Sequence, residues 1–349
     1  MSRPIYVWQP TTEEIARRAE IDPSQVVRFD HNTSPLSPAW AANLAAQLAP
    51  GLNEYPGADY FPLRQAVAGY IGCAPEQVVP GAGADELIDL CARAFLPVGG
   101  VAVSAPPSYA MYAVATGQRE AKLELVWREP PDFALPERFI HAAAGADVVW
   151  LCVPNNPTGR RDTDDEIEAV LEASAGVVVI DAAYAEFTGD RWAPWVERWP
   201  NLVVLGTLSK AFSLGGIRVG YAITAPLLAA ELQRCRPPGS VSSLSAAIAS
   251  EALRRPEDAK DMVQLIADGR NELSEGLAEL GWVMLPSVCN FVLGRVGPGA
   301  GALADTLMWE QGLVVRSFRP GSRLEDHLRV TVRTPGDHER LLSAVERTG

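Results

Sequence analysis

Short hydrophobic runs alternate with amphipathic segments between about residues 75 and 225. The runs that predict strands are 101–105, 148–153, 177–180, 202–207 and 219–223. These runs are almost continuously apolar. Strands of this kind, when helices separate them, are typical of a mainly parallel sheet that is covered on both faces. The pattern therefore predicts an α/β domain.

Two of the amphipathic segments carry clear helix signals. In the first, Leu87, Cys91 and Phe95 recur at helical spacing and predict a buried stripe. In the second, Thr163 and Glu166 have the spacing of a capping box, which marks the start of a helix. We therefore expect two helices here, each packing its apolar face on the sheet.

The pattern changes after about residue 230, where longer helical segments are followed by shorter strands. The strand candidates are 289–296, 312–318 and 327–333. This mixture indicates a smaller α+β domain, whereas the first thirty residues combine a helical segment with a Pro-rich stretch. The predicted division is an N-terminal arm at 1–33, a large domain at 34–230 and a small C-terminal domain at 231–349.

Composition and charge exclude several classes of protein. Of 349 residues, 48% are hydrophobic and 21% are charged, which suits a globular chain and not a disordered one. The net charge of −13 argues against nucleic-acid binding, which needs a basic face. The N-terminal segment lacks the order of a signal peptide, and the apolar runs are too short to span a bilayer. We expect a cytoplasmic protein that binds neither membranes nor nucleic acid.

The five cysteines and four histidines are dispersed along the chain. No Cys-x-x-Cys pair occurs, and no histidine lies at metal-ligand spacing from a cysteine. We therefore expect neither a disulfide framework nor a metal site.

Lysine is scarce, since only Lys122, Lys210 and Lys260 stand among 30 basic residues. Lys122 and Lys260 lie in charged, amphipathic surroundings and have the character of surface residues. Lys210 instead follows an apolar strand and is surrounded by Ser, Thr and Gly. A lysine in that position is a candidate for a neutral, nucleophilic amine.

Polar clusters directly follow three of the predicted strands. They are Asn155–Gly159, Asp181 with Tyr184, and Ser209-Lys210 with Arg218. Active sites of open α/β sheets lie at the carboxyl ends of the strands, so we expect these clusters to meet. Earlier in the chain, Gly81-Ala82-Gly83 opens a predicted helix, whose free N–H groups can hold an anion.

An amine, a carboxylate, a phenol, an amide and an anion cradle are together what pyridoxal 5′-phosphate (PLP) needs. Its aldehyde requires a lysine, and its pyridinium nitrogen requires a carboxylate partner. Its ring hydroxyl needs hydrogen bonds, and its phosphate needs N–H groups, hydroxyls and an arginine.

The same motifs resemble those of the class I/II (fold type I) PLP-dependent aminotransferases. Among these, the chain is most similar to the histidinol-phosphate aminotransferases. The resemblance covers nearly the whole chain, because GADELI, PPSYAMY, VPNNPTG, TLSKAF, CNFVL and LRVTV occur in the family's order. It implies an α/β fold with a mainly parallel, seven-stranded type of sheet between helices and a small α+β C-terminal domain. It also implies amino transfer between a histidinol phosphate-like or aromatic amine and a 2-oxo acid such as 2-oxoglutarate.

The resemblance implies catalytic roles for individual residues. Lys210 would bind the cofactor aldehyde and then move the proton between substrate Cα and cofactor C4′. Asp181 would keep the ring nitrogen protonated, Tyr184 and Asn156 would bond the ring oxygen, and Tyr109 would stack on the ring.

It implies binding roles as well. The phosphate would be held by Gly83, the backbone of Ala84 and Asp85, Thr207, Ser209 and Arg218. Tyr55 would reach the phosphate from the other subunit, which implies a homodimer. Arg329 would clamp the substrate carboxylate beside Asn156, and Arg316 would help to bind the substrate's own phosphate.

Several of the residues named above could have a purely structural role instead. Asp181 could cap a helix, Asn155–Gly159 could be only a turn, and Arg329 could be a charge on a strand surface. Arg319 and Arg323 could serve in place of Arg316.

The departures from the family's pattern surround the substrate mouth. They are His31–Pro35 near the start, Arg236–Ser240 after the large domain, and Arg333 in place of a glycine.

Three other functions are weighed against amino transfer. Threonine-phosphate decarboxylases resemble the same family and suit the segment 29–36 equally well. A nucleotide-dependent oxidoreductase is disfavoured because Glu86 occupies the third glycine position of its motif. A regulator with a degenerate aminotransferase domain is disfavoured because the enzyme-like pattern begins by about residue 29.

Overall fold

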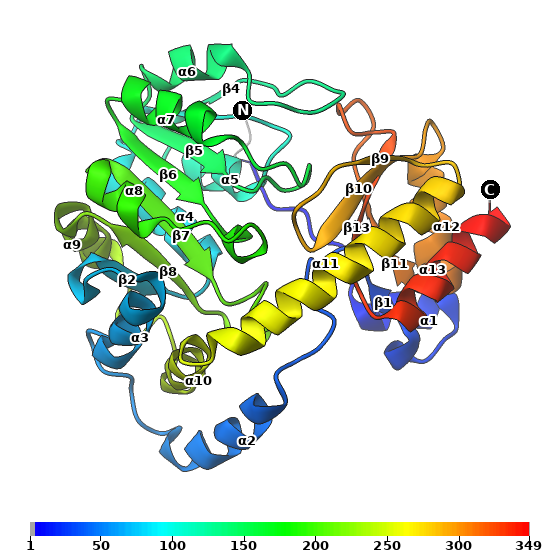
Figure 1. Cartoon of the computed structure of the whole chain (residues 1–349), viewed down its shortest axis with the longest axis horizontal. Helices are drawn as coiled ribbons and strands as arrows, with labels where there is room; N and C mark the ends of the chain where they lie inside the picture. The colour runs from blue at the N-terminus through cyan, green and yellow to red at the C-terminus, as the bar shows by residue number, and fades with distance from the viewer. Residues whose placement is uncertain (1–3, 349) are drawn as a thin grey trace.

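The larger part of the molecule is built around one β-sheet with the strand order β2-β8-β7-β6-β5-β3-β4 (Figure 1). The computed structural model describes residues 4–348, and within that range this sheet has seven strands. They are β2 (Val78–Gly81), β3 (Val101–Ser104), β4 (Lys122–Leu125), β5 (Val148–Cys152), β6 (Val177–Asp181), β7 (Leu202–Thr207) and β8 (Gly220–Thr224). Only β8 runs antiparallel to its neighbours, so the predicted α/β fold with a mainly parallel sheet is confirmed.

Helices cover both faces of this sheet. One face packs against α4 (Ala84–Phe95), α5 (Met111–Gln118) and α9 (Pro226–Cys235). The other packs against α3 (Phe61–Ile71), α6 (Glu137–Ala143), α7 (Asp164–Ala173), α8 (Ala193–Arg198) and α10 (Ser243–Leu253). Because side chains alternate along a strand, Trp150 of β5 enters the first core and Leu151 the second. The continuous apolar runs are thus explained by burial on both sides.

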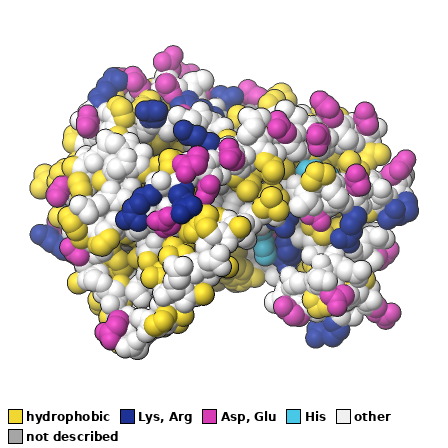
Figure 2. Space-filling model, turned by 60° about the horizontal axis from the view of Figure 1, so that its bottom comes forward, with side chains coloured by type: hydrophobic (Ala, Val, Ile, Leu, Met, Phe, Trp, Pro, Cys, Tyr) yellow, Lys and Arg dark blue, Asp and Glu magenta, His cyan; other side chains and the backbone are white. Residues whose placement is uncertain are grey.

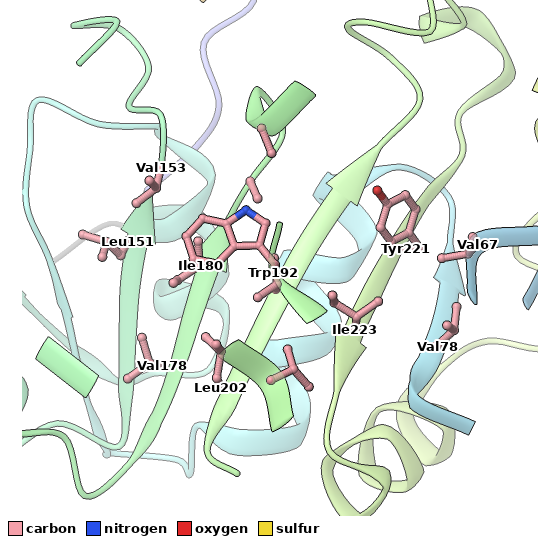
Figure 3. Close-up of a cluster of buried hydrophobic side chains, with 14 of the residues drawn as sticks. Val67, Val78, Leu151, Val153, Val178, Ile180, Trp192, Leu202, Tyr221 and Ile223 are labelled. Atoms are coloured by element: carbon pink, nitrogen blue, oxygen red, sulfur yellow. The ribbon is translucent and has the colours of Figure 1, made fainter. Parts of the chain in front are cut away.

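The second core can be followed in Figure 3. Leu151, Ile180 and Ile223 project from three strands on the same side of the sheet, and Trp192, the residue before α8, belongs to the same cluster. Trp192 is only 5% exposed. Burying an aromatic side chain of this size contributes about 1.5–3 kcal/mol.

Both helix signals read from the sequence correspond to helices. Leu87 and Cys91 of α4 are fully buried. The α7 capping box is formed: the Thr163 hydroxyl accepts from the Glu166 N–H at 3.2 Å, and the Glu166 carboxylate accepts from the Thr163 N–H at 2.7 Å.

The smaller part of the molecule is an α+β domain with a second sheet of strand order β12-β13-β10-β9. The strands are β9 (Val283–Leu285), β10 (Phe291–Arg295), β12 (Arg316–Ser317) and β13 (His327–Thr331), and the helices are α11 (Pro256–Glu279), α12 (Ala300–Gln311) and α13 (Pro335–Thr348). Figure 1 shows α11 running from the large sheet to this domain. Within residues 4–348, no helix is both long and apolar enough to cross a membrane.

Two segments make contacts across the predicted domain boundaries. The first of them is the arm predicted at 1–33, whose first three residues lie outside the described range. Its helix α1 (Thr12–Ala19) packs on α12, and its strand β1 (Val27–Arg28) pairs with β11 (Leu313–Val314). The arm therefore docks on the small domain. Conversely, α10 lies beyond residue 230 but packs on α3 and on α2 (Ala39–Leu48). The exact boundaries stay a prediction.

Candidate active site

The carboxyl ends of β5, β6 and β7 lie side by side at one edge of the large sheet. Their register is parallel, with Cys152 opposite Asp181 and Asp181 opposite Leu205. The polar segments that follow these strands are therefore brought together, as expected for an open α/β sheet. Figure 2 shows a notch between a larger and a smaller part of the molecule, with Lys or Arg side chains beside it.

Lys210 follows β7 by three residues and turns its amine toward the small domain. Its Nζ donates to the carbonyl oxygen of Asn32 at 3.0 Å and lies 5.7 Å from the centre of the Tyr184 ring. Burial lowers the pKa of Lys210 to about 8, and the positive charge of Arg329 acts in the same direction. The uncharged, nucleophilic form of this amine is therefore more accessible than that of an exposed lysine.

Asp181 is the last residue of β6 and is almost completely buried. Its Oδ2 accepts from the Tyr112 hydroxyl at 2.8 Å, and its Oδ1 accepts from the Ala183 N–H at 3.2 Å. Burial raises the pKa of Asp181 to about 6, while the hydrogen bond from Tyr112 favours the carboxylate. A carboxylate held in this way can stabilise a protonated ring nitrogen.

The amino end of α4 forms an anion cradle. Gly83 is its N-cap and has φ +82°, and a Cβ there would lie 2.5 Å from Arg218 Nη2. The backbone conformation therefore favours glycine, and the absence of a Cβ lets the guanidinium approach this closely. No side chain caps this helix, so the N–H groups of Ala84 and Asp85 remain available to an anion.

Hydroxyl groups complete the cradle. The Thr207 hydroxyl donates to Ser209 Oγ at 2.9 Å, and Arg218 Nη1 lies 3.5 Å from the same oxygen. The predicted phosphate-binding residues thus form one cluster of N–H groups, hydroxyls and a guanidinium.

The side chain of Asp85 also belongs to this cluster, although the sequence pointed only to its backbone. Its carboxylate accepts from the Tyr109 hydroxyl at 2.8 Å and pairs with Arg218 at 3.1 Å. Asp85 therefore orients both the aromatic ring predicted to stack on the cofactor and the arginine predicted to bind its phosphate.

Tyr184 lies buried between the two domains, and its hydroxyl accepts a hydrogen bond from Asn32 Nδ2 at 2.9 Å. Burial raises the pKa of Tyr184, so the phenol keeps its proton. Because the oxygen already accepts a hydrogen bond, its own hydrogen is free to be donated to a ring oxygen.

Arg329 lies on β13 and is 7% exposed. Its Nη1 donates to Asn156 Oδ1 and its Nη2 to the carbonyl oxygen of Asp30, each at 2.5 Å. Its Nε is buried and has no hydrogen-bond partner among the described residues. An unpaired buried guanidinium N–H is costly, so a carboxylate from a substrate would satisfy it. Asn156 is thereby positioned beside this arginine, as predicted for a substrate-binding residue.

Arg316 lies directly opposite Arg329 in the register of β12 and β13. In the described part of the chain, Arg316 has no ion-pair or hydrogen-bond partner, whereas Arg323 is paired with Glu129 and lies over the Trp127 ring. Arg319 is exposed. Of the three arginines that the sequence left open, Arg316 is the one that the strand register places next to Arg329, the predicted carboxylate clamp.

Tyr55 is the predicted site residue that this chain does not bring to the cluster. It follows the short 3-10 helix Ala49–Gly51, and 95% of its side chain is exposed. Within one chain it therefore has no role in the site.

Sequence reasoning missed Tyr112 and assigned no role to Asn32. Tyr112 stacks on Trp150 with ring centres 5.6 Å apart and planes 5° from parallel, which fixes its hydroxyl against Asp181. Asn32 contacts both Lys210 and Tyr184. The motif PPSYAMY contains Tyr112, but only the packing shows which of its two tyrosines contacts the carboxylate.

The cluster fits PLP on several independent observations. It holds one buried lysine amine, one buried strand-end carboxylate and a phenol that can donate. It also holds a helix N-terminus with an arginine guanidinium directly beside it. These are the partners that the aldehyde, the ring nitrogen, the ring oxygen and the phosphate require.

The fold and this site define a PLP-dependent enzyme of fold type I. The family model described as aminotransferase class I and II matches residues 24–347, and the chain belongs to that family. It is therefore a PLP-dependent transaminase, and PLP is its cofactor.

The relatives and solved structures that match this chain include histidinol-phosphate aminotransferases. Histidinol-phosphate aminotransferase 1 of Dechloromonas aromatica (strain RCB) is 35% identical, over 99% of this chain and 96% of the relative. A crystal structure of histidinol-phosphate aminotransferase from Sinorhizobium meliloti with PLP matches with a TM-score of 0.89 and 25% identity, covering 98% of this chain and 95% of that one. L-Threonine-O-3-phosphate decarboxylase from Porphyromonas gingivalis shares the fold, with a TM-score of 0.80 and 23% identity, over 92% of this chain and 98% of that one.

Proposed function

We propose that this enzyme moves an amino group between a histidinol phosphate-like or aromatic amine and a 2-oxo acid such as 2-oxoglutarate, in amino-acid biosynthesis in the cytoplasm. The observation that carries the proposal is the opposition of Arg316 and Arg329 on neighbouring strands. Like charges directly opposite each other destabilise a sheet, so the pair favours an anionic ligand between them. The carboxylates of glutamate and the phosphate of histidinol phosphate are such anions.

The names of the relatives support the same substrate class. They are histidinol-phosphate aminotransferases, and each match covers nearly the full length of the relative. The location in the cytoplasm rests on the sequence pattern alone.

The residues of the site would divide the chemistry between them. PLP, when bound, supplies an electron-poor ring that stabilises negative charge at substrate Cα. Lys210 would take the proton from Cα and return it at C4′. Asp181 would keep the proton on the ring nitrogen, Tyr184 would donate to the ring oxygen, and Arg329 would hold the substrate carboxylate.

A half-reaction screen tests the proposal. Purified PLP-loaded protein is mixed separately with histidinol phosphate, glutamate, the aromatic amino acids and O-phosphothreonine, and conversion of the cofactor to pyridoxamine phosphate is followed by absorbance. We expect conversion with histidinol phosphate and with glutamate. Failure of every amine to convert the bound cofactor would disprove amino transfer. Release of carbon dioxide from O-phosphothreonine without a keto acid would assign the decarboxylase reaction instead.

We expect Arg329→Ala to raise KM for every amino-acid and 2-oxo acid substrate by about 10- to 100-fold. The lost charge-assisted hydrogen bonds are worth about 1.5–3 kcal/mol, and the carboxylate is common to all these substrates. Steady-state kinetics with glutamate and 2-oxoglutarate measure the effect. Arg295→Ala is the matched control, because Arg295 lies on the neighbouring strand β10 with 58% of its side chain exposed. An unchanged KM in Arg329→Ala would remove this residue from the substrate site.

We also propose that the enzyme is a homodimer in which Tyr55 contacts the partner's cofactor phosphate. The support is the exposure of Tyr55 together with other large apolar side chains close to it in the sequence. These are Leu36, Leu52 and Phe61, which are 52%, 59% and 46% exposed. Contact with a second chain would remove these apolar side chains from water.

Mixing two inactive variants tests this arrangement. Tyr55→Ala and Lys210→Ala protomers are unfolded together and refolded as a mixture. If Tyr55 acts in the partner's site, half of the dimers are mixed and each has one intact site, so about a quarter of wild-type activity returns by random pairing. Recovery no greater than the sum of the separate variants would contradict a shared site.

A further inference from the structure

The chain from Phe29 to Ser34, which we call the crossing segment, runs along β13 and passes from the small domain to the large one. Alternate residues of β13, and of the chain directly after this strand, form hydrogen bonds with the crossing segment. Arg329 donates to the carbonyl oxygen of Asp30 at 2.5 Å, and the Thr331 N–H donates to that of Phe29 at 2.8 Å. The crossing segment is therefore held by the small domain through side chains and backbone on one face of β13.

Arg333, two residues beyond the end of β13, continues this series. Its Nη1 donates to Thr33 Oγ1 at 3.1 Å and to the carbonyl oxygen of Ser34 at 3.2 Å, and its backbone N–H donates to His338 Nε2 at 2.8 Å. The side chain is half-buried, so these bonds are partly shielded from water. Arg333 thus ties the far end of the crossing segment to the start of α13.

The far end of the crossing segment contacts the catalytic lysine. The Ser34 hydroxyl donates to the carbonyl oxygen of Lys210. Two residues earlier, the carbonyl oxygen of Asn32 accepts from Lys210 Nζ, and its side-chain amide donates to Tyr184. The crossing segment therefore sets the direction of the lysine amine and leaves the Tyr184 hydrogen free to be donated.

The conformation of Asn32 needs support from its surroundings. Asn32 has φ +52°, in the left-handed region, which asparagine adopts more readily than other non-glycine residues but which is still uncommon. Such a conformation persists only where neighbouring contacts hold it. Asn32 is 2% exposed and is tied to Thr331 and Asn290 on one side, and Arg333 holds the two residues that follow it.

We propose that Arg333 is a positioning residue for amino transfer: by holding Thr33 and Ser34 it keeps Asn32 aligned with Lys210 and Tyr184. It touches neither of these two residues and acts through the crossing segment. The proposal is independent of which amine or 2-oxo acid is the substrate.

Arg333→Ala tests the proposal, with Arg333→Lys as the conservative variant. Arg340→Ala is the matched control, because Arg340 lies on α13 and contacts only the exposed carbonyl of Gln25 among the described residues. Hydrogen exchange of the peptide 29–36, measured without cofactor, is expected to be about 10-fold faster in Arg333→Ala and unchanged in Arg340→Ala.

In the PLP-loaded enzyme, kcat with glutamate should fall about 10-fold with KM changed less than 2-fold, since alignment and not substrate binding is lost. Arg333→Lys should recover part of both effects, because an ammonium can still donate to one oxygen.

Coupling to Lys210 is tested with Ser34→Ala, alone and combined with Arg333→Ala. Because the two residues hold the same segment, the combined fall in kcat is expected to be less than the product of the single effects. If Arg333→Ala does not fold, Thr33→Val removes one of the two Arg333 contacts from the other side and should give smaller exchange and kcat changes in the same direction. Normal exchange of 29–36, or a lowered Tm with unchanged kcat, would overturn the proposal. This test can fail independently of the half-reaction screen, because hydrogen exchange of the peptide 29–36 is measured without any substrate.

Discussion

Replacing Lys210 by alanine is expected to abolish the visible absorbance of the Schiff base between cofactor and protein and to lower turnover by about 10⁴-fold or more. The variant loses both the amine that captures the cofactor aldehyde and the group that moves the proton, and positioned acid–base groups alone contribute about 10²–10⁴-fold. The spectrum of the purified protein and the single-turnover rate with glutamate measure the two losses separately.

Two variants sharpen this test. Lys210→Arg keeps the positive charge, but a guanidinium does not lose its proton at accessible pH, so it should be as inactive as the alanine variant. Lys122→Ala removes a lysine from the exposed edge strand β4 and should leave spectrum and rate unchanged. A yellow and active Lys210→Ala protein would show that the amine of the site lies elsewhere.

Asp181→Asn is expected to lower kcat by about 10³-fold, with little change in the fold. The amide has the shape of the carboxylate but carries no charge, so it cannot keep the ring nitrogen protonated. Removing one preorganised electrostatic partner from a water-excluded site costs about 10²–10³-fold in other enzymes, and Asp181 is only 3% exposed. Stopped-flow absorbance of the glutamate half-reaction measures the rate, and PLP titration measures the affinity.

Asp190→Asn is the control for this change. Asp190 is another aspartate of the large domain. It pairs with Arg161 at 2.9 Å and has no hydrogen bond to the site residues in the described part of the chain. Its replacement should leave the half-reaction rate within about 2-fold, as expected for a partly exposed pair worth about 1 kcal/mol or less. A wild-type rate in Asp181→Asn would mean that no charged partner is needed at the ring nitrogen.

The strands that the sequence predicted well are those buried on both faces. The run 202–207 coincides with β7, and 148–153 differs from β5 by one residue. The edge strand β4 was missed because its residues Lys122–Leu125 are largely exposed and alternate with charge, so no apolar run marks it. β2 was missed because it is four residues long and contains Pro80.

The small domain was predicted as α+β, but the segment 312–318 was taken as one strand. In the structure it forms two short strands that join different sheets, since Leu313–Val314 pairs with β1 and Arg316–Ser317 pairs with β13. Both partners are far away in sequence, and local pattern carries no information about such long-range pairing.

The cofactor-binding groups could be predicted from the sequence because each lies at the end of a strand or a few residues beyond it. Lys210, Asp181 and Asn156 need only a parallel sheet to meet at one edge. The contacts of Asp85 were not readable, since its partners Tyr109 and Arg218 stand 24 and 133 residues away.

By itself, the sequence determined the α/β class and the cofactor and predicted the residues that would hold it, because hydrophobic periodicity and strand-end chemistry are local properties of the chain. Tertiary structure alone decided how those residues are tuned and aligned. Burial shifts the pKa values of Lys210 and Asp181. Asn32 contacts Lys210 and Tyr184 only because residues 29–34 are hydrogen-bonded to β13 and to Arg333, about 300 residues further along. Desolvation and long-range hydrogen bonding depend on the packed chain as a whole, so no local pattern records them.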